Sequence, residues 1–133
     1  MDHGAIALAA GAAILFGAGT AGAAFGADQA KRTILNQIDI AGTDRIAEIG
    51  IGEATSGASI GLHSHPGEEL GYVLSGTAVL KVPGKPDREI RAGDTYTLPT
   101  GTVHNVVSVG GTSRVLVVWI VDKSKPLSTP APK

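Results

Sequence analysis

The chain of 133 residues contains no cysteine, and this absence excludes several kinds of site at once. It can form neither a disulfide bond nor a zinc–thiolate centre, and it offers no cysteine for lipidation. Charged residues make up 17% of the chain, with 11 basic and 12 acidic residues in near balance. Since the basic residues form no cluster, the composition argues against a nucleic-acid partner. The length corresponds to a single domain.

Alanine and glycine are abundant near the start of the chain. Residues 4–27 carry no charged side chain and consist mainly of these two residue types. We expect residues 1–27 to be a secretory signal peptide with a small-residue cleavage site at 21–24, which makes the mature protein periplasmic or secreted. The positive charges of Lys31 and Arg32 follow the run instead of preceding it, which is the reverse of the export pattern. Because the run is also long enough to cross a bilayer as a helix, a membrane-anchored chain with an uncleaved leader is the alternative.

Downstream of residue 30 the sequence shows no helical periodicity. Short apolar runs, several of them alternating, are separated by turn signals, a pattern typical of an all-β sandwich or barrel. We expect this domain to span residues 28–122 and to contain strands at 33–40, 45–51, 71–74, 77–82, 88–91, 95–98, 104–109 and 113–121. Gly76 is expected in a tight hairpin turn that needs a positive φ. The Pro-rich tail, residues 123–133, is expected to be poorly ordered.

Three histidines and a glutamate form a candidate metal site. His63 and His65 are separated by one residue, so on a strand both rings project from the same face. Pro66-Gly67 then breaks the strand, and a hairpin of this kind can direct the Glu69 carboxylate back towards the rings. With His104 from a later strand, three nitrogens and one oxygen converge. This mixed set suits one divalent transition metal (Fe, Mn, Ni, Co or Zn) better than Mg or Ca.

Two adjacent glutamates compete for the role of oxygen ligand, and strand phase separates them. Glu69 shares its face with the small or apolar side chains of Gly71 and Val73, which could line a cavity. Glu68 points to the opposite face. We therefore expect Glu69 to face the site and Glu68 to be a solvated charge in the turn.

The spacing of these residues resembles both signature motifs of the cupin superfamily, G(X)5HXH(X)3,4E(X)6G and G(X)5PXG(X)2H(X)3N. Every position of the first motif is met, by Gly57, His63, His65, Glu69 and Gly76. The second is met by Gly93, Pro99, Gly101 and His104, and it departs at its last position, where Ser108 stands in place of Asn. That Asn is not a metal ligand in the family, so the departure concerns local hydrogen bonding.

The resemblance covers roughly residues 31–121 and is to small single-domain bacterial-type cupins (cupin type 2, quercetin-dioxygenase-like). It implies a jelly-roll barrel, also called a double-stranded β-helix, with a metal inside held by His63, His65, Glu69 and His104. The ends of small cupins often pack across a dimer. The resemblance therefore implies a homodimer, in which Leu127 of the tail would dock on the second subunit.

The superfamily includes dioxygenases, isomerases, decarboxylases and proteins without catalysis, so the resemblance does not select a function. One hypothesis is a small oxygenase-like metalloenzyme acting on a small organic molecule, with an isomerase or decarboxylase as runner-up. A second is a non-catalytic, metal-dependent domain that binds or senses a small ligand. A third is a structural cupin whose metal only ties the barrel together.

No catalytic residue can be assigned beyond the candidate ligands. By strand phase, Tyr72 and Asn105 are expected to point away from the ligand face, whereas the phase of Tyr96, Arg114 and Trp119 is ambiguous. The mostly aliphatic walls expected around the site favour an apolar or aromatic small molecule.

Overall fold

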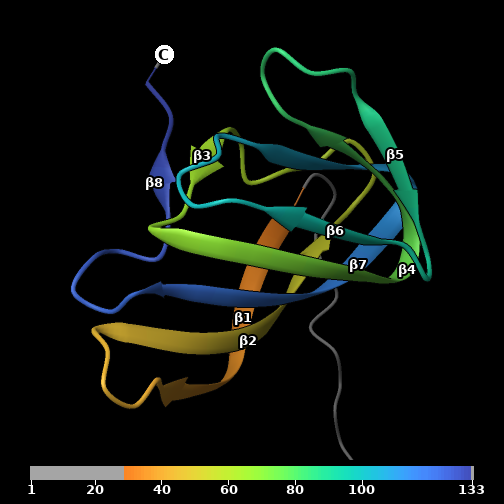
Figure 1. Ribbon diagram of the computed structural model, residues 1–133. Coiled ribbons are helices and arrows are strands. Elements are labelled where there is room, and N and C mark those ends of the chain that lie inside the picture. Colours follow the sequence, from red (N-terminus) through yellow and green to blue (C-terminus); the bar gives the residue numbers. More distant parts are fainter. Residues whose placement is uncertain (1–28, 133) are drawn as a thin grey trace, which may run out of the picture.

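The computed structural model describes residues 29–132, which are all-β, as predicted (Figure 1). The strands are β1 (Ala30–Asp39), β2 (Arg45–Ala54), β3 (His63–Ser64), β4 (Gly67–Lys81), β5 (Arg88–Arg91), β6 (Thr95–Leu98), β7 (Asn105–Asp122) and β8 (Thr129–Pro130). No helix in this part of the chain is long and apolar enough to cross a membrane. The expected leader, residues 1–27, lies outside the described residues.

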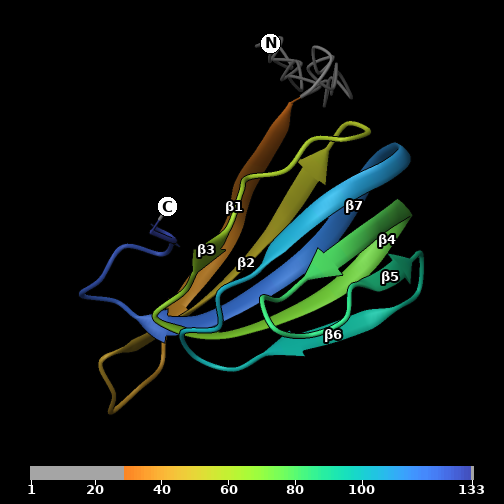
Figure 2. The ribbon, with the colours of Figure 1, turned by 90° about the horizontal axis from the view of Figure 1, so that it is seen from above.

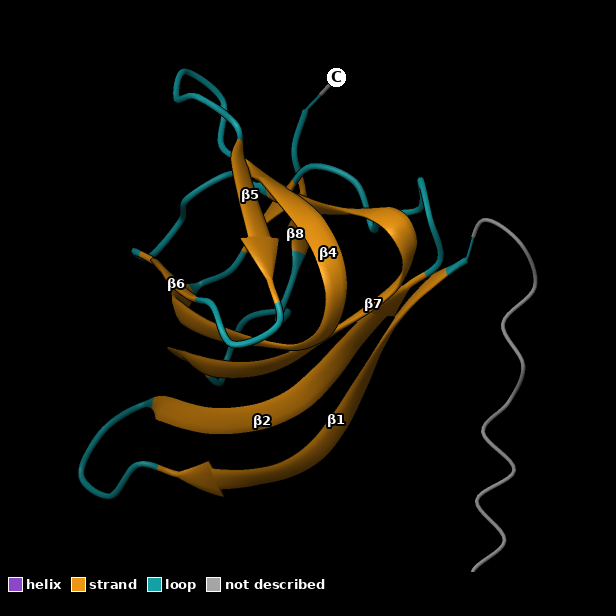
Figure 3. Cartoon of the chain, turned by 90° about the vertical axis from the view of Figure 1, so that its right-hand side faces the viewer, coloured by secondary structure: helices purple, strands orange, loops and turns teal. Residues whose placement is uncertain are grey.

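Two long antiparallel strands, β4 and β7, form the frame of the barrel. Six strands share one sheet in the order β1-β2-β7-β4-β5, and β6 pairs with β4. The first half of β4 pairs with β6 and the second half with β5, while β7 accompanies β4 along nearly its whole length. Because both strands bend into an arch (Figure 3), their two halves lie in two facing layers. Figure 2 shows β1 and β2 extending one layer from β7.

Two breaks expected from the sequence are bends within continuous strands. Gly76 has a φ of +77°, as expected, but it lies in a bulge of β4 and not in a hairpin turn. A Cβ at this position would lie 2.4 Å from the carbonyl oxygen of Thr112 on β7, so a larger residue is excluded. Likewise β7 runs unbroken through Gly110 and Gly111, where two strands were expected. The hairpin prediction is wrong because a bulge and a tight turn can require the same positive φ.

Ser108, which replaces the Asn of the motif, is fully buried beside the bend of β7. Its hydroxyl donates a hydrogen bond of 2.6 Å to the carbonyl of Gly111. Its backbone pairs with the loop that precedes β3, through Gly57 and Ala58. The local hydrogen bonding that the departure from the motif put in question is therefore complete.

The core lies between the two layers. Burial alternates along β4 and β7, so every second side chain points inward. The buried apolar cluster consists of Val73, Ala78, Leu80, Ile90, Tyr96, Leu98, Val115, Val117, Trp119 and Val121. This packing leaves the polar site described below at one side of the apolar core.

The C-terminal tail is part of the fold. β8 pairs antiparallel with β3, and Leu127 packs against the core of its own chain. The backbone N–H of Ala131 donates to the carbonyl of Leu62 at 3.0 Å. The expectation of a poorly ordered tail is therefore wrong for residues 123–132, because β3 offers backbone partners that the composition of the tail does not reveal.

Candidate metal centre

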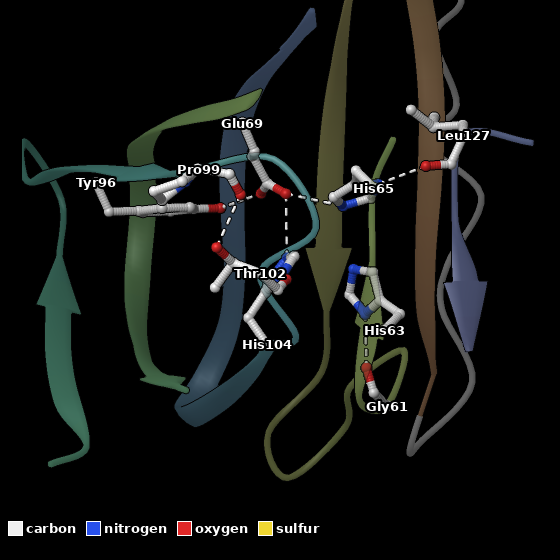
Figure 4. A network of polar contacts seen from close by, with 9 residues as sticks. All are labelled: Gly61, His63, His65, Glu69, Tyr96, Pro99, Thr102, His104 and Leu127. Carbon is white, nitrogen blue, oxygen red and sulfur yellow. Dashed lines mark hydrogen bonds and ion pairs between the residues drawn. The ribbon is translucent and has the colours of Figure 1, made fainter. Parts of the chain in front are cut away.

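The four candidate ligands lie together inside the barrel (Figure 4). His63 belongs to β3, His65 follows it, Glu69 lies in β4, and His104 directly precedes β7. A bridge between His63 and His104 joins β3 to the start of β7. All four side chains are buried, with at most 6% of each residue exposed. The three histidines offer ligand atoms that lie within 4.8 Å of one another, so they form a cluster able to bind a metal.

The backbone fixes the same tautomer in all three imidazoles. Each Nδ1 lies within hydrogen-bond distance of a main-chain carbonyl: 2.7 Å for His63 to Gly61, 2.7 Å for His65 to Leu127, and 2.9 Å for His104 to Thr102. Because a carbonyl can only accept, each Nδ1 carries the hydrogen and each Nε2 keeps its lone pair. Orientation of a ring by its second nitrogen is a recurrent feature of metal-binding histidines.

The turn from Pro99 to Thr102 explains the spacing of the second motif. Both the backbone N–H and the hydroxyl of Thr102 donate to the carbonyl of Pro99, at 3.1 and 2.8 Å. The N–H of Gly101 donates to the carbonyl of His65 at 3.1 Å. This turn places the Thr102 carbonyl beside Nδ1 of His104, and the bond from Gly101 ties the turn to the backbone of His65.

Glu69 presents one carboxylate oxygen to the histidines and the other to Tyr96. Its Oε2 lies 2.8 Å from Nε2 of His65 and 3.1 Å from Nε2 of His104. Its Oε1 accepts a hydrogen bond of 2.8 Å from the Tyr96 hydroxyl. Burial alone would raise the pKa of Glu69, but the close contacts with the imidazoles of His104 and His65 outweigh it and hold that pKa well below its usual range.

These contacts supply a test of whether a metal fits. With the Nδ1 hydrogens used on the carbonyls, Nε2 of His65 and Oε2 of Glu69 are both acceptors, and neither has a hydrogen-bond partner although both are buried. Acceptors at this separation require either an additional proton on an imidazole or a cation between them. Three nitrogens and one anionic oxygen are a donor set suited to a divalent transition metal.

The protonation state of His63 also suits a metal. Burial lowers the pKa of His63 to about 4, with smaller contributions in the same direction from His104, His65 and Arg32, while the hydrogen bond to Gly61 opposes the shift. His63 is therefore neutral at neutral pH, which is the state that can coordinate.

Sequence reasoning left the orientation of Tyr96 open, and the structure places it in the site. The ring reaches Glu69 because β6 pairs with β4 with Tyr96 beside Gly71. A Cβ at Gly71 would lie 2.2 Å from the Tyr96 ring, so a glycine is needed for the ring to occupy this space. Burial and the neighbouring Glu69 raise the pKa of Tyr96 well above its usual value, which keeps the hydroxyl protonated as a donor.

The two adjacent glutamates separate as strand phase predicted, with Glu69 inside and Glu68 outside. Glu68 is not simply solvated, however. It forms an ion pair with Arg45, and its side chain is about half exposed at 46%. The ion pair forms because β2 and β4 both pair with β7, which places Arg45 of β2 near Glu68 at the start of β4.

The remaining candidates divide between the two faces of the sheet. Tyr72 points outward as expected and is 45% exposed. Asn105 was expected to point away from the ligands, but it lines the cavity beside them and donates to the Ser59 hydroxyl at 3.0 Å. Trp119 points inward, and the centre of its ring lies 5.9 Å from the centre of the His65 ring. Arg114 points outward. The Asn105 prediction is wrong because this residue lies at the very start of β7, where strand phase is not yet established.

A cavity opens beside the four candidate ligands. Its volume is about 70 Å³, several times the roughly 10–15 Å³ that one water needs. The inner faces of β1, β2 and β7 form its walls, which include Arg32 and Trp119. Sequence reasoning gave Arg32 no role in the site, and no local pattern marks it, because it lies about thirty residues before the first motif histidine.

Comparisons with known proteins agree with this geometry. An oxalate-binding protein of Thermotoga maritima is 38% identical over 66 residues, which are 49% of this chain and 54% of that protein. The chain spans about half the length of the curated relatives it matches. The solved structure of the polyketide cyclase RemF from Streptomyces resistomycificus is 29% identical with a TM-score of 0.62, over 81% of this chain and 75% of that one.

A cupin superfamily protein from Desulfitobacterium hafniense shares the fold alone, at 20% identity and a TM-score of 0.60, over 74% of this chain and 84% of that one. The predicted jelly roll is therefore confirmed. The family described as the cupin domain matches residues 51–121, more than half of the chain and the segment that holds both motifs. Sequence match, barrel and buried histidine cluster lead to one conclusion: this chain belongs to the cupin domain family.

Proposed function

We propose that this chain binds one divalent transition metal through Nε2 of His63, His65 and His104 and Oε2 of Glu69, and with it binds a small organic molecule in the adjoining cavity. The observation that carries the proposal is the set of three Nδ1–carbonyl hydrogen bonds, which leaves the Nε2 lone pair of every histidine free for a metal. Two of these nitrogens, those of His65 and His104, lie 2.8 and 3.1 Å from one carboxylate oxygen of Glu69. A metal held by four protein ligands supplies open positions for oxygen atoms of a ligand.

The size of the cavity and the comparisons support a small ligand. The cavity of about 70 Å³ suits a molecule of a few heavy atoms better than an extended one. The Thermotoga relative carries oxalate binding in its name, and oxalate is a ligand of this size with several oxygen donors.

A small oxygenase-like metalloenzyme is the second candidate. The state of Tyr96 favours it over enzymes that use a protein acid or base, because this hydroxyl is committed to Glu69 and its pKa is raised. Glu69 is in turn committed to the histidines and Tyr96. An oxidation carried by a redox metal asks less of these residues than proton transfer does. An isomerase or a decarboxylase remains the runner-up.

Metal analysis of purified variants tests the binding proposal. We expect about one metal per wild-type chain, and a strong loss of metal in His63→Ala, His104→Ala and Glu69→Gln. Glu68→Gln is the matched control, because it removes the neighbouring carboxylate that points away from the site. Occupancy like that of the wild type in both histidine variants would contradict the proposed ligand set.

Turnover is tested with enediols, catechols and β-diketones, under air and without oxygen. Activity that requires both O2 and Fe(II) or Mn(II), and is lost with redox-inert Zn(II), would establish an oxygenase. Activity that persists with Zn(II) and without O2 would indicate an isomerase or decarboxylase. If the protein binds a ligand but no metal form turns it over, the protein is a binding domain without catalysis.

A further inference from the structure

Arg32 lies in the wall of the cavity without a counter-ion at contact distance. It is half-buried on β1, and its guanidinium carbon lies 5.2 Å above the centre of the Trp119 ring. Within residues 29–132, no carboxylate oxygen lies within 4.0 Å of this guanidinium. Burial lowers its pKa, and the charges of Glu69 and Glu48 oppose that shift from a greater distance.

The neighbouring cations differ from Arg32 in this respect. At the rim of the cavity, Glu53 binds both Lys31, at 3.6 Å, and Arg114, at 3.0 Å. Both of these basic side chains share the one carboxylate of Glu53, and because both are more than 40% exposed they are screened by water. The guanidinium of Arg32 is thus the better placed of the three to attract a ligand inside the cavity.

The balance of charge around the cavity favours an anion. A divalent metal bound next to Glu69 leaves one net positive charge at the centre, and Arg32 adds a second. Glu48 offsets one of these two charges without contacting Arg32, so one net positive charge remains inside the barrel. A buried excess of positive charge is costly unless a ligand balances it.

We propose that Arg32 is the anion-binding residue of this cavity, and that the ligand is a small organic acid with one oxygen on the metal and a carboxylate on the Arg32 guanidinium. This inference rests on the proposed metal-dependent binding function. Contact with the Trp119 face holds the guanidinium in place, and its fork of N–H donors matches a carboxylate. An acidic ligand replaces the apolar or aromatic one expected from the sequence.

The test uses the full chain loaded with Mn(II). Oxalate, malonate and succinate, which differ in length, are titrated into the wild type, Arg32→Gln, Arg32→Lys and Lys31→Gln, and oxamide serves as a neutral analogue. Metal content and thermal unfolding are measured for every variant. For at least one diacid we expect Arg32→Gln to weaken binding by roughly 10–100-fold with unchanged metal content, because hydrogen bonds to charged groups are the strong ones.

Arg32→Lys should fall between the wild type and Arg32→Gln, since it keeps the charge and loses the fork. Lys31→Gln should change affinity by less than about threefold, as expected for an exposed ion-paired cation. The assignment of Arg32 would be overturned if each of the three diacids bound the wild type and Arg32→Gln with the same affinity. It would also be overturned if the wild type bound oxamide as tightly as oxalate. Either result would leave the proposed metal binding intact. A wild-type chain that takes up no metal would overturn both proposals.

Discussion

At the scale of single residues, the site depends on side chains that orient the candidate ligands as much as on the ligands themselves. Tyr96 holds Oε1 of Glu69, which leaves Oε2 directed at the histidines. Without this bond the carboxylate could rotate about its side-chain torsions, since its other contacts all involve the same oxygen. The hydroxyl of Tyr96 therefore acts as a positioning group for the proposed metal.

Replacing Tyr96 with Phe should lower metal affinity by roughly 10–100-fold with little effect on the fold, because the ring still fills its space beside Gly71. Competition with a chelator of known affinity measures the change. Tyr72→Phe is the control, since that hydroxyl is on the outer face. Equal affinities of the two variants would show that Glu69 is held by other means.

Protonation of His63 should limit the stability of the metal-free chain in acid. Burial lowers the pKa of His63 to about 4, whereas an unfolded chain has the ordinary value near 6.5. Between these values the unfolded state binds more protons, so the stabilising contribution of His63 is complete above about pH 6.5 and is lost as the pH falls towards 4. Urea unfolding of the apo chain at several pH values measures this slope. His63→Gln should flatten it, and an unchanged slope would argue against a neutral buried His63.

At the scale of elements, the β3–β8 pair links the C-terminal tail to the candidate metal centre. The Leu127 carbonyl, in the segment that leads into β8, accepts the Nδ1 hydrogen of His65. The tail therefore helps to set the direction of a ring more than sixty residues earlier in the chain.

A chain that ends at Pro126 should bind metal roughly 10–100-fold more weakly, because His65 loses its orienting carbonyl. Chelator competition again gives the affinity. Leu127→Ala separates the causes, since it keeps the carbonyl and removes only packing against the core. If the substitution lowers metal affinity as much as the truncation does, packing and not the hydrogen bond is responsible.

At the scale of the whole molecule, the outer face of the sheet carries an apolar patch. The register brings Leu70, Val118 and Ile49 into one row and Tyr72 and Leu116 into the next. Leu70 and Tyr72 are 43% and 45% exposed. Exposed apolar rows that continue from one strand to the next are typical of an interface.

We propose that a second copy of the chain covers this face, in agreement with the homodimer implied by the resemblance. Light scattering coupled to size exclusion should give twice the chain mass for the wild type and the chain mass for Val118→Lys, because a charge at the centre of the face is not tolerated in an interface. Thr112→Lys, at the exposed bend of β7, should remain dimeric. A monomeric wild type would contradict the proposal. Leu127, expected at the dimer contact, packs within its own chain.

The leader is the other question at this scale. We propose that residues 1–27 are removed on export and that the mature protein is periplasmic or secreted. A chain that begins at Asp28 should then fold, bind metal and melt cooperatively, and N-terminal sequencing of protein from its native host should find a start between residues 22 and 28. An intact N-terminus in the membrane fraction would establish the anchored alternative.

The sequence by itself determined the features that depend on local phase and spacing. His63 and His65 lie on one face because alternation along an extended chain has a period of two, and the same rule turns Glu69 inward and Glu68 outward. The motif spacing then identified His104 as the fourth candidate ligand, and the family resemblance predicted the jelly-roll fold. Positive φ at Gly76 was also predictable, since glycine adopts it without steric cost.

Tertiary structure alone decided what depends on the register between distant strands. Tyr96 reaches Glu69 through the pairing of β6 with β4, Arg32 reaches the cavity through β1, and Leu127 reaches His65 through the segment that leads into β8. Register is set by long-range packing, and shifting it by one residue would turn each side chain to the opposite face without changing any local pattern. For the same reason the bulge at Gly76 could be distinguished from a hairpin only once β7 lay beside β4.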